Sequence, residues 1–342
     1  PHEILQEGMD AGLVAQDISE EYGGKGYDLE QILAINEEFY AADAGIALTL
    51  MLASFGCEII ETYGTEEQKD EYLRPVAANE QISGLAVSEP QTGSDMAGMT
   101  TTAERTDDGW VLNGEKYWVG NAVEADWLTV YAKTGDGDDR YSNYSMFIVE
   151  TDTPGYEAEH IPEKIGMRAS KQGHIVFDDC EIPEENLVGT EGGGFYVLAD
   201  FFNHGRVVVG GHGIGLAARA IEETWAFVHD REAFGRNIAE FQSTQHILAD
   251  MRMEFEAARA LNWRAAHKVE TGEDAGFWAA ATKTKSTETA MHCAERGMQL
   301  HGGRSVLEEY PISRVYRDVR IPVIYEGANE IQRNLIYRQG GV

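Results

Sequence analysis

The sequence has few basic residues and few cysteines, and each shortage argues against a class of protein. Its 342 residues include 27 Lys and Arg against 59 Asp and Glu, which gives a formal net charge of −32. Nucleic acid is therefore not expected as the main partner, because phosphate binding needs a basic surface. The three cysteines, Cys57, Cys180 and Cys293, are odd in number and far apart. They fit neither a disulfide framework nor a zinc cluster, and we expect a reducing, cytoplasmic environment.

Long hydrophobic runs are also missing. The longest uncharged apolar stretch runs over residues 44–57, which is 14 residues, whereas a membrane-spanning helix needs about 20. We therefore expect no membrane insertion. A hydrophobic content of 43% with 10% aromatic residues is enough for a packed core, and the length predicts two or three domains. Because Pro1 is not an initiator methionine, we expect the sequence to begin inside a longer protein.

Several catalytic motifs are absent as well. There is no Gly-x-Ser-x-Gly nucleophile elbow, and no pair of histidines stands at metal-ligand spacing with a supporting carboxylate, so we expect no metal site. Gly213, Gly215 and Ala218 do fit the G-x-G-x-x-A dinucleotide fingerprint. The segment after them has a helical pattern and no second parallel strand, so we interpret these glycines as points where two helices approach closely.

The excess of acidic residues is spread along the whole chain. Only 9 of the basic residues are Lys and 18 are Arg. Such a surface repels itself and stays soluble where salt screens it, which indicates a salt-rich cytoplasm.

The pattern of apolar, glycine and proline residues changes twice along the chain. Residues 1–84 are expected to form an N-terminal helical domain, with capping boxes at Asp28/Gln31 and Thr65/Gln68, a helix over 44–60 that is buried on several sides, and Pro75 limiting the last helix. Residues 85–190 carry short β-branched runs between Gly, Asp and Pro clusters, which predicts a small antiparallel β barrel or sandwich. Within it, Asn113-Gly114 has the strongest hairpin signal.

Residues 191–342 are predicted to form a helical bundle. Long helical patterns cover about 196–231, 242–271 and 275–300, and a shorter one follows Asn329. The fold class is therefore α+β and multidomain.

Five segments, taken together, resemble the acyl-CoA dehydrogenase family. They are LAVSEPQTGSD (85–95), NGEKYWVGN (113–121), DREAFG (230–235), QLHGG (299–303) and YEGANEIQR (325–333). They keep the family's order and spacing over essentially the whole chain. The resemblance implies a helical domain, a β domain and a C-terminal four-helix bundle, in agreement with the division above.

The resemblance also implies cofactor, substrate and partners. It implies FAD, held between the β domain and the bundle with part of the site supplied by a second subunit. It further implies an acyl-CoA substrate, fatty acid β-oxidation, a homo-oligomer that is usually a tetramer, and an electron-transferring flavoprotein as electron acceptor.

The site residues that the resemblance implies fall into three groups. Glu326 is the catalytic base. The implied cofactor-binding residues are Leu85, Val87, Ser88, Ser94, Trp118, Gly120, Arg231, Phe234, Gln242, Gln299, Gly302, Gly303, Ala328 and Glu330. The implied substrate-binding residues are Ser94, Asn203, Arg206, Tyr325, Glu326, Gly327 and Arg338.

The surroundings of Glu326 in the sequence suit a base. It follows an apolar run over 321–324, and Gly327 leaves room beside it for a substrate. Loss of water raises the pKa of a carboxylate, as removal of a proton from carbon requires. The resemblance implies that Glu326 takes the α proton of the thioester while a hydride leaves the β carbon for flavin N5, giving the trans-2-enoyl product. The backbone N–H of the glutamate and a ribityl hydroxyl are implied to bind the thioester oxygen.

The sequence departs from the family at four places. Gly120 stands where many members have Thr or Ser, Ala328 replaces a frequent Thr, and Arg304-Ser305 interrupts a Gly-rich continuation. Gly205 lies near the position where some relatives carry their base, and a glycine cannot serve.

Two other functions stay open on the sequence alone. One is an acyl-CoA oxidase, or another flavin enzyme of the same fold that is reoxidised by oxygen. The other is a binding or scaffold protein that kept the fold without turnover. Straight, branched and aromatic acyl groups are all compatible with the sequence.

Overall fold

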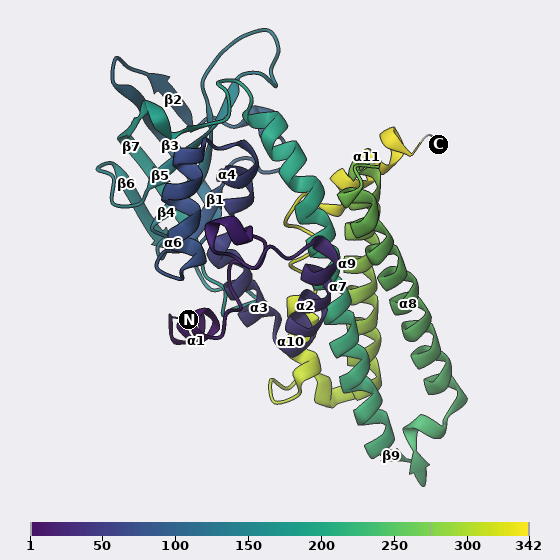
Figure 1. The fold of residues 1–342 in the computed structure, drawn as a ribbon. Helices are drawn as coiled ribbons and strands as arrows, with labels where there is room; N and C mark the ends of the chain where they lie inside the picture. The colour runs from purple at the N-terminus through teal and green to yellow at the C-terminus, as the bar shows by residue number, and fades with distance from the viewer. Residues whose placement is uncertain (1, 274, 341–342) are drawn as a thin grey trace. The chain divides into compact units, whose positions relative to one another are not determined.

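The computed structural model describes residues 2–273 and 275–340, and it confirms the predicted fold class. A helical N-terminal part, a β-sheet middle part and a helical C-terminal part follow one another along the chain (Figure 1). The chain divides into two compact units. Unit 1 comprises residues 1–27, 48–163 and 169–201, and unit 2 comprises 28–47, 164–168 and 202–342. The predicted domain boundaries near 84 and 190 stay a prediction.

The N-terminal part consists of short helices. They are α1 (His2–Asp10), α2 (Leu29–Ala42), α3 (Ala44–Met51), α4 (Cys57–Tyr63), α5 (Glu66–Gln68) and α6 (Arg74–Ala77), with 3₁₀ turns at Glu20–Tyr22 and Leu52–Ser54 and a π turn at Lys69–Leu73. Both predicted capping boxes are present, at Asp28/Gln31 and at Thr65/Gln68. The helical segment runs past Pro75 to Ala77, further than we predicted, and a π turn precedes the proline.

We predicted one helix over the apolar stretch 44–60. The structure instead has two helices, separated by a 3₁₀ turn and by Gly56. Gly56 has φ +93°, and a Cβ there would lie 2.5 Å from Thr129 Oγ1, so only glycine fits this break. Among the described residues, Ala44–Tyr63 is the one segment with the length and apolar composition of a membrane span. About two thirds of it (67%) is buried inside the protein, as in the core helix of a globular protein.

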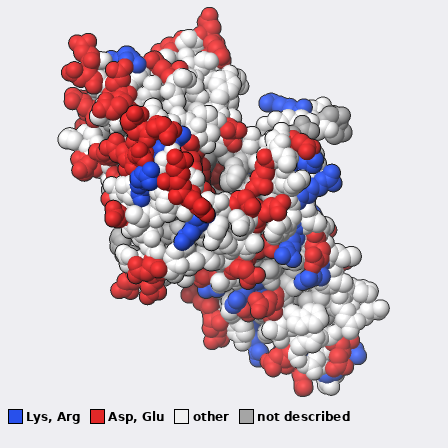
Figure 2. Space-filling view, viewed as in Figure 1, with Lys and Arg blue, Asp and Glu red and all other residues white. Residues whose placement is uncertain are grey.

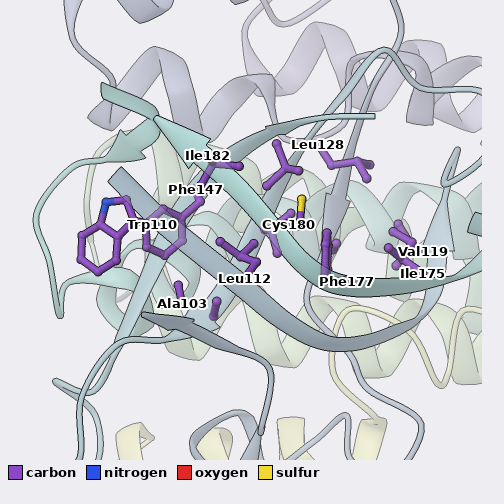
Figure 3. Close-up of a cluster of buried hydrophobic side chains, with 14 of the residues drawn as sticks. Ala103, Trp110, Leu112, Val119, Leu128, Phe147, Ile175, Phe177, Cys180 and Ile182 are labelled. Atoms are coloured by element: carbon purple, nitrogen blue, oxygen red, sulfur yellow. The ribbon is translucent and has the colours of Figure 1, made fainter. Parts of the chain in front are cut away.

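The middle part of the chain forms one eight-stranded sheet. Its strands are β1 (Ser83–Ala86), β2 (Thr102–Arg105), β3 (Gly109–Gly120), β4 (Trp127–Lys133), β5 (Tyr144–Glu150), β6 (Tyr156–His160), β7 (Gln172–Pro183) and β8 (Leu187–Val188). Their order is β6-β7-β3-β2-β4-β5-β8, and β1 pairs with β4. Most pairs are antiparallel, but β1 runs parallel to β4, and β2 also pairs with β4 in parallel. Trp110, Leu112, Phe147 and Phe177 belong to the buried cluster of this sheet (Figure 3).

The predicted hairpin at Asn113-Gly114 is wrong. Strand β3 runs straight through both residues and pairs with β7, and the register shifts between Leu112 and Gly114. The Asn113 side chain donates to Asp179 Oδ1 at 3.0 Å, and the Asp179 N–H donates back to Asn113 Oδ1 at 2.9 Å. The dipeptide therefore forms a β-bulge, the other structure in which a strand uses a glycine with positive φ.

The C-terminal helices agree closely with the sequence prediction, except for a short helix over residues 311–318 that was not predicted. They are α7 (Gly194–Asp230), α8 (Gln242–Glu270), α9 (Ala275–His301), α10 (Pro311–Asp318) and α11 (Asn329–Gln339). A two-stranded ribbon, β9 (Glu232–Ala233) and β10 (Arg236–Asn237), connects α7 to α8.

The glycines of the false dinucleotide fingerprint lie inside α7 and allow close helix packing, as predicted. A Cβ on Gly213 would lie 2.7 Å from the backbone carbon of Ser286 in α9, and one on Gly215 would lie 2.6 Å from the Glu37 carbonyl of α2. Since backbone atoms block both positions, a side chain there would force the helices apart.

We expect Gly213→Ala to lower the free energy of unfolding by about 1–3 kcal/mol, because overpacking would push α9 away from α7. Urea unfolding followed by circular dichroism measures this change. Gly303→Ala is the control, since nothing lies within 4 Å of a Cβ at that position. Equal stability of the Gly213→Ala variant and the wild type would contradict the packing account.

Candidate active site

Glu326 lies in a short left-handed turn between α10 and α11, inside unit 2. Glu326 has φ +52° and Gly327 has φ +85°, and a side-chain-bearing residue in this region is strained unless its surroundings hold it. The next residue, Ala328, is the N-cap of α11, and its carbonyl accepts the Ile331 and Gln332 N–H groups.

The carboxyl group of Glu326 is withdrawn from water although the residue is half-buried. Its Oε2 atom is buried and has no hydrogen-bond partner. A Cβ built on Gly205 of α7 would lie only 3.2 Å from this oxygen. Burial raises the pKa of Glu326 to about 7, against the opposing charges of Arg206 and Lys283. A carboxylate with this pKa can accept a proton near neutral pH.

Arg206 is the first cation near this carboxylate. Burial lowers its pKa to about 10, although the charge of Glu326 acts in the other direction. Its Nη1 donates to Asn203 Oδ1 at 3.3 Å, and its Nε is buried without a partner. The structure therefore brings the predicted residues Asn203, Arg206 and Glu326 into one locality.

Lys283 of α9 is the second cation, and the sequence analysis missed it. The side chain is fully buried, and its Nζ donates to the Gly327 carbonyl and to Asn329 Oδ1, each at 2.8 Å. Burial lowers its pKa to about 7, against the charge of Glu326. The signal that could have identified it is a lysine at helical spacing from the buried Ala279 and Thr287.

Gln332 holds the same turn from α11. Its Nε2 donates to the carbonyls of Gly327 at 3.0 Å and of Glu326 at 3.3 Å. A Cβ at position 327 would lie 2.3 Å from this amide nitrogen, so the turn requires glycine for space as well as for its φ. Gln332 was also missed, although it lies within the YEGANEIQR segment.

His212 anchors the residue before the base. Its Nδ1 lies 2.8 Å from Tyr325 Oη, and its ring stacks on Tyr40 with centroids 3.9 Å apart. Burial lowers the pKa of His212 to about 3, so the ring is neutral near pH 7. It therefore has a structural role, as a neutral partner of Tyr325 and Tyr40.

The predicted cofactor residues of unit 1 lie around β1 and β3. Leu85 is buried in β1, Val87 and Ser88 follow it half-buried, and Ser94 is exposed. Trp118 is 60% exposed and has φ +67°, at a register shift between Tyr117 and Val119. This bulge turns a large aromatic ring outward from the sheet, an arrangement that often marks a binding surface.

A buried ion pair fixes the segment after β1. Lys116 Nζ donates to Glu89 Oε1 at 3.1 Å and to the Val87 carbonyl at 2.8 Å. Glu89 also accepts the N–H groups of Thr100 and Thr101. Burial opposes ionisation of Glu89, but Lys116 and these donors together lower the pKa of its carboxyl to about 2.

Two of the departures from the family pattern, at Gly120 and Ser305, have local compensations, and the one at Ala328 has none among the described residues. A Cβ at Gly120 would lie 2.8 Å from Leu52 Cδ1, so Leu52 occupies the space of the missing side chain. Ala328 provides no side-chain cap for α11. Ser305 Oγ donates to the Gly302 carbonyl at 2.8 Å and closes the turn there.

The remaining predicted residues of unit 2 lie at or near helix ends. Arg231 and Phe234 follow α7, and Gln242 begins α8. Gln299 is near the end of α9, and Gly302 and Gly303 lie in the 3₁₀ turn that follows this helix, while Glu330 and Arg338 are on α11. The His301 ring stacks on Phe227 at 4.1 Å, so the end of α9 lies beside the last turns of α7. Phe234 is 96% exposed. Among the described residues, no hydrogen bond or ion pair joins this group to Glu326.

Family comparisons cover nearly the whole chain. Models for the acyl-CoA dehydrogenase N-terminal, middle and C-terminal domains match residues 1–80, 84–180 and 192–341. A probable acyl-CoA dehydrogenase, fadE25 of Mycobacterium leprae, is 36% identical over 339 residues, which are 99% of this chain and 87% of that protein.

Solved structures give the same result. Butyryl-CoA dehydrogenase from Megasphaera elsdenii has a TM-score of 0.95 and 33% identity, covering 100% of this chain and 90% of that one. A chain from a study of the electron transferring flavoprotein of Acidaminococcus fermentans has a TM-score of 0.94 and 34% identity, with 99% and 89% covered. PigA with FAD and proline has a TM-score of 0.94 and 28% identity, with 100% and 90% covered.

We expect Lys116→Met to lower the free energy of unfolding by about 3–5 kcal/mol at pH 7, because it leaves the Glu89 charge buried without its cation. The difference from the wild type should narrow as the pH falls from about 4.5 toward 2. Below a pH of about 4.5 the unfolded chain takes up a proton on Glu89, whereas the folded wild type keeps this carboxylate ionised down to about pH 2. The stability that the ion pair gives the wild type is therefore present above pH 4.5 and is lost as the pH falls toward 2.

Lys133→Met is the matched control, since Lys133 pairs with Asp136 at the surface. This change should cost within about 0.5 kcal/mol. A loss in the Lys116→Met variant no larger than in the control, measured by urea unfolding, would contradict the role given to the buried pair.

Proposed function

This chain belongs to the acyl-CoA dehydrogenase family, and we propose that Glu326 is the base that removes the α proton of its acyl-CoA substrate. The protein is an acyl-CoA dehydrogenase, an oxidoreductase that uses FAD. The observation that carries the proposal is the buried Oε2 of Glu326, which has no partner of its own. A buried carboxylate oxygen without a hydrogen-bond partner is unfavourable, and a bound substrate could provide that partner. The same oxygen can then accept a proton from the substrate.

The pKa of Glu326 supports a role as proton acceptor. At about 7 the carboxylate is strong enough to take a proton and still about half ionised near neutral pH. The left-handed turn at Glu326 holds the side chain in place, with Tyr325 bonded to His212 on one side and Gly327 bonded to Lys283 on the other. We propose that this rigidity keeps the base aimed at the α carbon.

We propose that each unit carries residues that contact FAD. We propose that Trp118, Ser88 and the backbone near Gly120 contact the ring system, since Trp118 presents a large apolar ring outward. Gly302 and Gly303 have nothing within 4 Å of a Cβ, so backbone can approach a pyrophosphate closely there, and Arg231 supplies a guanidinium for bidentate bonds. When bound, FAD supplies the hydride acceptor of the reaction.

We propose that Arg206 and Arg338 attract the CoA phosphates, because they are cations in a strongly acidic protein. Ser94, Asn203, Tyr325 and Gly327 complete the proposed substrate site. One structural relative is a butyryl-CoA dehydrogenase, which makes butyryl-CoA the first substrate to test. The reaction would then convert it to the trans-2-enoyl thioester.

We further propose an electron-transferring flavoprotein as acceptor and a homotetramer as the assembly. A structural relative from a study of an electron transferring flavoprotein supports the first proposal. The exposed Phe234 supports the second, because large apolar side chains at the surface mark contacts between subunits. All three cysteines are buried and free, which supports a reducing cytoplasm.

We expect Glu326→Gln to lower kcat with butyryl-CoA by at least about a thousandfold, since the amide cannot accept the proton. Bound flavin, measured by its visible absorbance, should be retained, because the substitution preserves shape. Near-wild-type turnover in a flavin-loaded variant would end the assignment of the base.

The acidic surface leads to a second prediction, which rests on the proposal that the protein is adapted to salt. On the face drawn in Figure 2, Asp and Glu gather over the strand-rich part while Lys and Arg are scattered. We expect the Tm to rise between about 0.1 M and 1 M KCl, as the Debye length falls from about 10 Å to about 3 Å. KCl is used because sulfate salts stabilise most proteins, which would hide the effect of screening the acidic charges. A Tm that falls or stays constant in KCl would contradict the proposal.

A further inference from the structure

Lys283 directs a buried ammonium group at the turn that carries Glu326. Its Nζ donates to the Gly327 carbonyl and to Asn329 Oδ1, both at 2.8 Å. The Asn329 amide in turn donates to Thr287 Oγ1 at 3.0 Å, one helical turn after Lys283. Lys283 of α9 is therefore hydrogen-bonded both to the Glu326–Gly327 turn and to the first residue of α11. Gln332 of α11 donates to the same Gly327 carbonyl.

The charge of Lys283 needs an explanation beyond these hydrogen bonds. Taking a lysine out of water costs free energy, and an uncharged donor could bond both oxygens without that cost. The side chain is fully buried, and Lys283 forms no salt bridge among the described residues. Among the surrounding charges, the Glu326 carboxylate next to the bonded carbonyl has the largest effect on Lys283.

Resting on the proposed role of Glu326, we propose that Lys283 is a positioning residue for this base. It locks the left-handed turn through the Gly327 carbonyl and supplies positive charge that stabilises the ionised carboxylate. The turn has φ +52° at Glu326 and +85° at Gly327, so a fixed donor at its carbonyl offsets the strain. The charge offsets part of the penalty that burial imposes on the carboxylate.

The charged groups around the turn come from three helices. Arg206 faces Glu326 from α7 and Lys283 faces it from α9, while the negative Glu288 of α9 and Glu330 of α11 act on Lys283. Tyr325 stays neutral, because burial raises its pKa. Burial raises the pKa of Glu326 to about 7 and lowers that of Lys283 to about 7, and each group opposes the shift of the other.

The test compares Lys283→Gln and Lys283→Met with the wild-type holoenzyme. Lys283→Gln keeps a donor for the Gly327 carbonyl and removes only the charge. Two quantities are measured: the acid limb of kcat/KM against pH with butyryl-CoA, and the infrared titration of the carboxyl band that Glu326→Gln abolishes.

We expect both midpoints to rise by about one pH unit in both variants, because a nearby cation no longer favours ionised Glu326. From the ionised fraction alone, activity at pH 7 falls about fivefold. Unchanged midpoints in folded Lys283→Gln would overturn the proposal.

Lys285→Met is the matched control. Lys285 lies two residues further along α9 and pairs with Glu254 instead, so both midpoints should stay at the wild-type values. An equal shift in this control would show that any lost lysine acts through net charge, and the proposal would be wrong.

A second variant covers the case in which neither Lys283 substitution folds. Asn329→Leu keeps about the size of the side chain, adds no charge and removes one of the two oxygens that bind the Lys283 ammonium. Lys283 then carries its charge less often, so the Glu326 midpoint should rise in the same direction. No change in that variant would count against Lys283.

The infrared titration also separates this inference from the proposed function. If Glu326 is not the base, Glu326→Gln retains its turnover, whereas the Glu326 band still reports whether Lys283 affects its ionisation.

Discussion

The chemistry of this protein depends on keeping one carboxylate out of water without neutralising it permanently. A buried glutamate with no counter-charge would stay protonated well above neutral pH, and one paired tightly with an arginine would be too weak a base. Glu326 lies between these limits, because burial acts against two cations, Arg206 and Lys283, and its Oε2 has no hydrogen-bond partner. The helices around the turn provide both the burial and the two cations that set the pKa of Glu326.

Helix packing creates the space for it. Helix α7 passes beneath the carboxylate at Gly205, where a Cβ would lie 3.2 Å from Oε2. The glycines near 213 bring α7 close to α9, and α9 carries Lys283. In unit 1 a buried ion pair, Glu89 with Lys116, has a comparable structural role for the segment after β1. In each unit a buried lysine donates to a backbone carbonyl outside helices and strands, Lys116 to Val87 and Lys283 to Gly327.

Much of the fold could be predicted from the sequence, because long amphipathic helices and capping boxes are local signals. The limits of α7, α8 and α9 agree with the predicted helices within a few residues, and both capping boxes are present. The prediction of a hairpin at Asn113-Gly114 was wrong because a turn and a bulge can both use a glycine with positive φ, and only pairing with a distant strand decides between them. Lys283 was missed for a related reason. A lysine in a helix is solvated by default, and its burial depends on helices that meet only in the folded chain.

The most direct measurement of the central claim separates proton removal from hydride transfer. An acyl-CoA with sulfur in place of the β carbon cannot lose a hydride, so its α hydrogens exchange with D₂O only if the enzyme abstracts a proton. The wild-type holoenzyme should catalyse this exchange, with a rate that rises with pH through about 7, and the Glu326→Gln variant should not. Equal exchange rates in the two proteins would contradict the claim that Glu326 is the base.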